Sequence, residues 1–98
     1  MLKEFKNDEK NLYEAILSLK TEEECRAFLL DVCTIQELEA LTQRLAVAIK
    51  LGAGETYVDI NKSIGASTAT IGRVAKALNY GSGGYRTVLE RLGDKNEK

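Results

Sequence analysis

Apolar residues recur three and four positions apart along most of this 98-residue chain. That spacing matches the 3.6-residue period of an amphipathic helix, and strand-like alternation of apolar and polar positions is almost absent. The chain also contains no proline, the residue that most strongly breaks helices. The pattern therefore predicts an all-α fold with six helices.

The first three predicted helices carry broad apolar stripes and clear start signals. The first runs from about Leu2 to Leu19. The second begins at Thr21 and the third at Thr34, and each is opened by a Thr-x-x-Glu capping box that satisfies free backbone amides. The third helix is expected to end at the glycine pair Gly52 and Gly54.

Those stripes exceed what the shorter C-terminal helices could cover. A chain of this length buries a modest share of its surface, so a partner subunit is a natural source of further burial. We interpret residues 1–98 as a single domain in which residues 1–55 form a helical dimerisation portion. The alternative is a monomeric bundle in which the same helices fold back on each other.

A helix-turn-helix pattern occupies residues 56–79. Thr56 is expected to cap its first helix, and Gly65 stands where a left-handed residue would stop that helix sharply. Ser67 is then a natural N-cap for the second helix. The apolar residues that two crossed helices need lie on both sides of the turn: Ile60, Ile64, Ile71, Val74 and Leu78. An αα-corner without DNA binding would use the same glycine and is the alternative interpretation.

The opposite face of the second helix combines small residues with cations. Thr68, Ala69 and Gly72 would let the helix approach base edges, whereas Arg73 and Lys76 suit phosphate or guanine. A glycine inside a helix costs about 1 kcal/mol relative to alanine. Gly72 therefore indicates either a close approach of DNA or a tight helix crossing.

Positive charge is concentrated around this motif. The chain as a whole has a net charge of −1. Residues 1–55 carry seven Lys or Arg against eleven Asp or Glu, a net charge of −4, whereas residues 56–92 carry five against two, a net charge of +3. This asymmetry is what a localised phosphate-binding face would produce, although a solvated helix surface gives similar counts.

A glycine-rich connection, Tyr80-Gly-Ser-Gly-Gly84, separates the motif from a short last helix over residues 84–93. The run lacks the lysine of a P-loop and the flanking strand of a dinucleotide fold. It is therefore interpreted as a connection rather than a phosphate site.

Composition excludes several other functions. The chain has no histidine and no Cys-x-x-Cys pair, so we expect no metal site, no cofactor and no catalysis. Cys25 and Cys33 are expected to be reduced, buried small residues. No apolar run is long enough for a signal peptide or a membrane span, so we expect a cytoplasmic protein with no membrane partner.

The motifs Leu41-Thr-Gln-Arg44, Gly54-Glu55 and Gly65-Ala-Ser-Thr-Ala-Thr-Ile-Gly-Arg73 resemble the tryptophan repressor superfamily. Asn79-Tyr-Gly-Ser-Gly-Gly-Tyr85 narrows the resemblance to its Trp-repressor-like YerC/YecD group, and the similarity runs from about Leu29 to Leu92. The resemblance implies an intertwined homodimer of six-helix subunits that presents two helix-turn-helix heads to successive major grooves of double-stranded DNA.

The resemblance also assigns residues to two roles. The DNA-facing positions of the family fall on Asn61, Ser67, Thr68, Ala69, Thr70, Gly72 and Lys76. The positions that hold the family's amino-acid corepressor fall on Thr34, Arg44, Thr70 and Arg73.

Other pocket positions argue against tryptophan itself as the effector. Val74 stands where the family has glycine and Ala77 where it has serine, while Asp31 and Cys33 replace leucines. A different small-molecule effector and no effector at all both stay open, because Arg44 and Arg73 could equally form an ion pair or contact phosphate. Taken together, the sequence predicts a transcription regulator, a repressor of a palindromic operator, with a helical protein-interaction module as the alternative.

Overall fold

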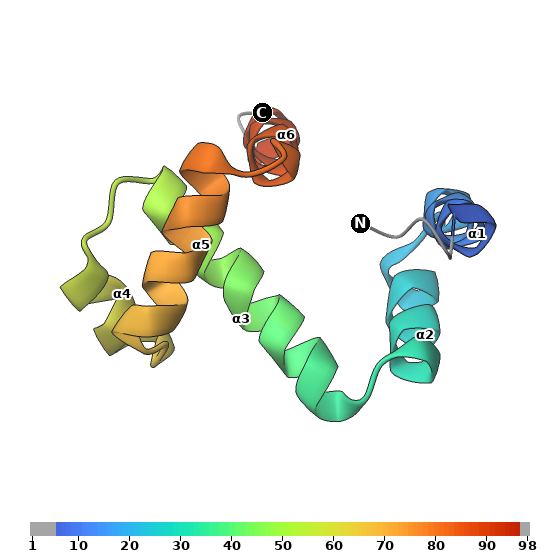
Figure 1. The fold of residues 1–98 in the computed structure, drawn as a ribbon, viewed down its shortest axis with the longest axis horizontal. Coiled ribbons are helices and arrows are strands. Elements are labelled where there is room, and N and C mark those ends of the chain that lie inside the picture. Colours follow the sequence, from blue (N-terminus) through green and yellow to red (C-terminus); the bar gives the residue numbers. More distant parts are fainter. Residues whose placement is uncertain (1–5, 97–98) are drawn as a thin grey trace. The chain divides into compact units, whose positions relative to one another are not determined.

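The structure, a computed structural model, describes the backbone of residues 6–96 and the side-chain environment of residues 6–93. Within that range the chain forms six α-helices and no strand (Figure 1), so the all-α prediction is confirmed. Residues 2–5 of the first predicted helix lie outside the described residues. The helices are α1 Lys6–Ser18, α2 Glu22–Val32, α3 Ile35–Gly52, α4 Tyr57–Ile64, α5 Thr68–Tyr80 and α6 Gly84–Asn96. The last helix is thus three residues longer than predicted.

Threonine side chains cap the starts of α2, α3 and α4; at α4 the Asp59 amide donates to Thr56 Oγ1 (3.2 Å). The Glu37 amide donates to Thr34 Oγ1 (3.1 Å) and the Thr34 amide donates to Glu37 Oε1 (2.8 Å), which completes a reciprocal capping box. At Thr21 the first bond is present, from the Glu24 amide (3.0 Å), but the Glu24 carboxylate accepts from the Lys20 amide instead. Each cap satisfies amides that the first turn of a helix leaves free.

The chain divides into two compact units, residues 1–38 and residues 39–98. In the second unit, α5 packs against both α4 and α6 (Figure 1). The core of this unit draws on α3, α4, the turn and α5: Val47, Ala48, Ile60, Ala66, Ile71 and Val74. Ile64, Leu51 and Tyr85 pack against this core.

The helix-turn-helix packing prediction is confirmed, whereas the stripe predicted on α3 is divided. Ile60 and Ile71 are fully buried, as the spacing predicted. On α3 the buried residues are Val47 and Ala48, while Ile49 is 44% exposed. A wide apolar stripe covers more than one side of a helix, and the α4–α5 pair covers only part of it.

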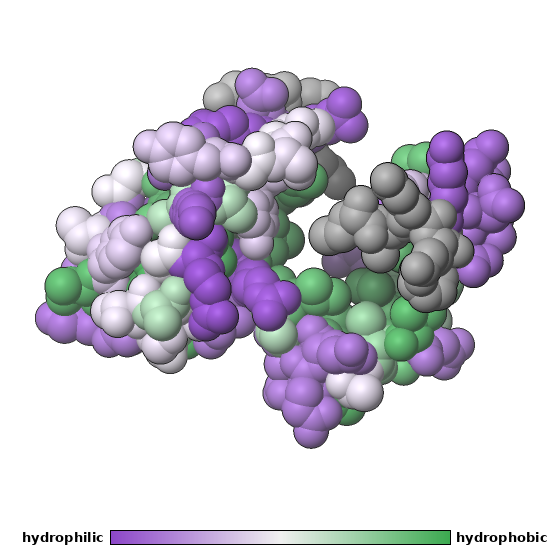
Figure 2. All heavy atoms as spheres, in the orientation of Figure 1, coloured by the Kyte–Doolittle hydropathy of each residue, from purple (hydrophilic) through white to green (hydrophobic). Residues whose placement is uncertain are grey.

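The described part of the first unit, residues 6–38, has no comparable core. Neither α1 nor α2 contains a buried residue, and hydrophobic side chains reach the surface around α2 (Figure 2). The expectation that both cysteines are buried is wrong for Cys25, which is exposed, and Cys33 is half-buried. Among residues 6–38, the large exposed hydrophobic residues are Leu12, Tyr13, Ile16, Leu17, Leu30, Val32 and Ile35.

Candidate functional site

The turn between α4 and α5 has the geometry that the glycine predicted. Gly65 adopts a left-handed conformation (φ 83°, ψ 11°), which glycine reaches without a steric penalty. Its amide donates to the carbonyl oxygen of Asn61 (2.8 Å), which closes the last turn of α4. The chain therefore leaves α4 abruptly at Gly65 and is free to change direction.

The start of α5 is held by polar and apolar contacts together. Ser67 is the N-cap, and its Oγ accepts a hydrogen bond from the Thr70 amide (3.1 Å). The same Oγ lies 3.1 Å from Thr70 Oγ1, to which it donates. Ala66 before the cap and Ile71 after it are both buried in the core, in the arrangement of a hydrophobic staple. These contacts define where α5 begins.

The face of α5 opposite its core residues is open. Thr68, Ala69, Arg73 and Lys76 are exposed, as is Ser67 before them. No ion pair or hydrogen bond engages the Arg73 or Lys76 side chain within residues 6–93. This face therefore offers two cations and several small side chains to a partner.

Gly72 lies on the border of this face and is partly exposed. A Cβ built at Gly72 meets no heavy atom within 4 Å. Within the described part of the chain, a tight helix crossing therefore does not require this glycine. Of the two interpretations of Gly72, the structure disfavours a tight helix crossing and is consistent with close approach by a partner.

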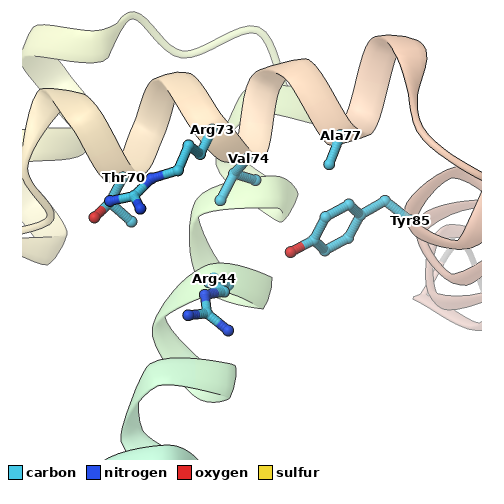
Figure 3. A pocket seen from close by; sticks show the side chains of 6 residues that line it. All are labelled: Arg44, Thr70, Arg73, Val74, Ala77 and Tyr85. Carbon is cyan, nitrogen blue, oxygen red and sulfur yellow. The ribbon is translucent and has the colours of Figure 1, made fainter. Parts of the chain in front are cut away.

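A cavity of about 250 Å³ lies between α3, α5 and α6. Arg44 reaches it from α3 and Tyr85 from α6, with the tyrosine hydroxyl directed toward the cavity (Figure 3). The remaining wall comes from α5: Thr70, Arg73, Val74 and Ala77. Three of the four residues that the family resemblance assigns to effector binding, Arg44, Thr70 and Arg73, thus line one cavity.

For two residues, the lining of this cavity differs from the sequence-based expectation: Tyr85 lines it without having been predicted, and Thr34 is not among its lining residues. Tyr85 was not among the residues predicted for the site, although its position directly after the glycine run could have suggested a polar role. Thr34 lies in the first unit, where its hydroxyl caps α3, and its role in effector binding stays a prediction.

The cavity is electropositive. Its lining contains two guanidinium groups and two hydroxyls but no carboxylate. Neither Arg44 nor Arg73 forms an ion pair with another described residue. Guanidinium groups bind carboxylates and phosphates through paired, charge-assisted hydrogen bonds. The arrangement is therefore suited to a small anionic ligand.

Residues 6–93 were compared with the requirements of a metal site and of a membrane-spanning helix. No group of three His, Cys, Asp or Glu side chains gathers there as metal ligands. Among the helices described, none combines the length and apolarity that crossing a membrane requires. Outside the site, a hydrogen bond to the Glu9 carboxylate raises the pKa of the exposed Tyr13.

Comparison with known proteins identifies the family. The model of the family described as Trp repressor protein matches residues 7–93. The uncharacterized protein YerC of Bacillus subtilis (strain 168) is 52% identical over 81 residues, which cover 83% of this chain and 78% of YerC.

Solved structures agree with that assignment. A candidate Trp repressor from Staphylococcus aureus superposes with a TM-score of 0.85 at 42% identity, over 89% of this chain and 87% of the other. A TrpR like protein from Eubacterium eligens ATCC 27750 superposes with a TM-score of 0.82 at 54% identity, over 86% and 87% of the two chains. The six-helix fold, the helix-turn-helix and these similarities together place the chain in the Trp repressor family.

Proposed function

We propose that this protein is a sequence-specific DNA-binding transcription regulator, a repressor that reads a palindromic operator through α5. The observation that carries the proposal is the exposed face of α5, where Arg73 and Lys76 have no partner among residues 6–93. A recognition helix enters the major groove with its N-terminal residues toward the bases. Ser67, Thr68, Ala69, Thr70 and Gly72 occupy that end of α5.

We further propose that the regulator acts as a homodimer. The unburied apolar side chains of α1 and α2 support this proposal, because a lone protomer would leave them in water. An apolar groove of the second unit offers a surface of the same character and is lined partly by Leu45 and Val88. Two reading heads about 34 to 36 Å apart would make the operator two-fold symmetric.

The test begins with selection of bound sequences from a random DNA pool. A two-fold symmetric consensus is expected, and its absence would contradict both the reading role and the dimer. Binding of the selected DNA is then titrated at two salt concentrations, because displaced counterions make phosphate contacts salt-dependent. We expect affinity to fall steeply as salt rises.

Charge reversals separate this function from its alternative, a protein-interaction module with a structural αα-corner. Arg73→Glu and Lys76→Glu should each abolish measurable specific binding, because they place an acid against phosphates or bases. The matched control is Arg26→Glu, which makes the same charge change on exposed α2. Retained DNA binding in both α5 variants would show that α5 does not read the DNA, and absence of DNA binding by the unmodified protein would favour the alternative.

The cavity between α3, α5 and α6 supports a second element of the proposal, a small anionic effector held by Arg44 and Arg73. Val74 and Ala77 line the same space, where the family resemblance places smaller or polar side chains. We therefore expect L-tryptophan to bind weakly or not at all.

Thermal shift and titration calorimetry with L-tryptophan, acetate, citrate and inorganic phosphate test this element. Binding of an anion by the unmodified protein that Arg44→Ala abolishes would support it. If none of these probes shifts the unfolding temperature, the arginines would instead be assigned to phosphate contact or structural pairing.

A further inference from the structure

The turn that joins α4 to α5 is bonded twice to a single residue of α4. The carbonyl oxygen of Asn61 accepts from the Gly65 amide (2.8 Å), as a helix end requires. Its side-chain Nδ2 donates to the carbonyl oxygen of Ala66 (2.7 Å), the next residue along the turn. Asn61 therefore forms hydrogen bonds with both residues of the turn that precede the N-cap of α5, Gly65 and Ala66.

The carbonyl of Ala66 needs this donor. Ala66 lies between the two helices and is only 1% exposed, so water has little access to its carbonyl oxygen. A buried carbonyl left without a partner costs the free energy of its lost hydration. The Asn61 amide supplies the partner that neither helix provides.

The bond acts at the point where α5 meets the core. Ala66 packs into the same hydrophobic cluster as Ile71, one turn into α5. Thr68 and Ala69, which begin the exposed face, follow within three residues of Ala66. A shift of the Ala66 peptide would therefore move the reading end of α5 relative to α4.

We propose that Asn61 is a positioning residue for DNA reading. Its side-chain amide fixes the direction in which α5 leaves the turn. It thereby orients the first residues of α5 toward the major groove of the bound DNA. This inference rests on the proposed function, since the direction of α5 affects binding only if α5 reads DNA. The competing role, a direct phosphate contact by the same amide, makes different predictions.

The first experiment needs no DNA. Asn61→Asp keeps the size of the side chain but removes the donor and sets a carboxylate against the Ala66 carbonyl. We expect amide hydrogen exchange at Gly65 and Thr70 to become about tenfold faster, the effect of losing a hydrogen bond of ordinary strength. Exchange at Glu24, whose amide is capped by Thr21 in the other unit, should be unchanged.

Ser63→Ala is the matched control, because Ser63 is exposed on α4 and bonds only within its own helix. Its exchange at Gly65 should equal that of the unmodified protein. Unchanged exchange at Gly65 in the Asn61→Asp protein would overturn the inference. If that variant does not fold, Asn61→Ala, which also lacks the donor, carries the same measurement.

The second experiment measures binding of the selected operator by Asn61→Ala at several salt concentrations. A positioning role predicts about tenfold weaker specific binding, with unchanged non-specific binding and an unchanged salt slope. A lost phosphate contact would instead weaken both kinds of binding and lower the slope by about one, and that result would overturn the inference. Failure of the unmodified protein to bind any DNA would refute the proposed function, whereas hydrogen exchange still decides whether Asn61 holds the turn.

Discussion

Residues 6–38 and residues 39–93 are built from the same kind of amphipathic helix, yet only the second set buries its apolar side chains. Ile60 and Ile71 are fully buried, whereas Leu17 is 82% exposed and Val32 is 57% exposed. The difference shows that an amphipathic stripe marks the side of a helix that needs cover. The stripe does not indicate whether the residues that cover it belong to the same chain or to a partner.

Covering the exposed apolar side chains would contribute a large free energy for a protein of this size. Burying a leucine, isoleucine or valine side chain contributes about 1.5 to 3 kcal/mol relative to leaving it exposed. The exposed stripe of α1 alone contains Leu12, Ile16 and Leu17. A second copy that covered them would add stability comparable with the total stability of many small domains.

The largest expected effect would come from breaking the well-packed unit. Ile71→Ala removes a fully buried side chain at the start of α5 and should lower the free energy of unfolding by about 2 to 5 kcal/mol. Urea denaturation followed by circular dichroism measures the change. Ile71→Val, which removes one methyl group, should cost about 0.5 to 1.5 kcal/mol. Equal losses in the two variants would show that this core does not limit stability.

A charge on the other unit should separate the proposed dimer. Ile16→Glu places a carboxylate on the apolar stripe of α1, and we expect a monomer by analytical ultracentrifugation. Operator affinity should fall by about 100-fold, because two linked reading heads gain at least that much from their effective concentration. Glu14→Gln, an exposed polar change on the same helix, is the control. A dimeric Ile16→Glu protein would disprove the role assigned to α1.

The unmodified protein provides a third test of the same contrast. If a second copy completes the first unit, the stability must depend on protein concentration by mass action. A tenfold increase in concentration should raise the free energy of unfolding by about 1.4 kcal/mol per dimer. Denaturation curves measured at several concentrations provide the check, and superimposable curves would indicate a protomer that is stable alone.

The smallest expected effect concerns Gly72, where stability and reading should move in opposite directions. Gly72→Ala should stabilise the protein by about 1 kcal/mol, since the new methyl group meets nothing within 4 Å. The same methyl group should weaken operator binding about fivefold, within the range of one imperfect base-pair contact.

The control for that substitution is Gly93→Ala in α6, where an added Cβ also meets no neighbour within 4 Å. It should raise the unfolding temperature without changing DNA affinity. If Gly72→Ala also leaves affinity unchanged, DNA does not approach α5 closely at this position.

The starts and ends of the helices were predictable because the responsible contacts are local. Thr34 and Glu37 cap each other across three residues, and Ser67 caps Thr70 across three. The stop at Gly65 depends on the backbone freedom of one residue. Interactions of this range are contained in any short window of sequence.

Which apolar residues of a helix become buried was less predictable than where the helix begins and ends. On α3, Leu41 and Ile49 have the helical spacing of core residues, yet they remain 46% and 44% exposed, whereas Val47 is fully buried. Periodicity gives the angular width of a stripe, whereas the covered part depends on the helices packed against it.

The candidate sites divide in the same way. The residues of the exposed face of α5 follow from its periodicity alone, and the family resemblance assigns Arg44 and Arg73 to one site. That Tyr85 completes their cavity, and that the Asn61 amide is bonded to the Ala66 carbonyl, were decided only by the tertiary structure. Tyr85 reaches the cavity through the angle at which α6 packs against α5, which no local stretch of sequence specifies. Asn61 and Ala66 are only five residues apart, but their bond requires the backbone conformation that the turn at Gly65 adopts.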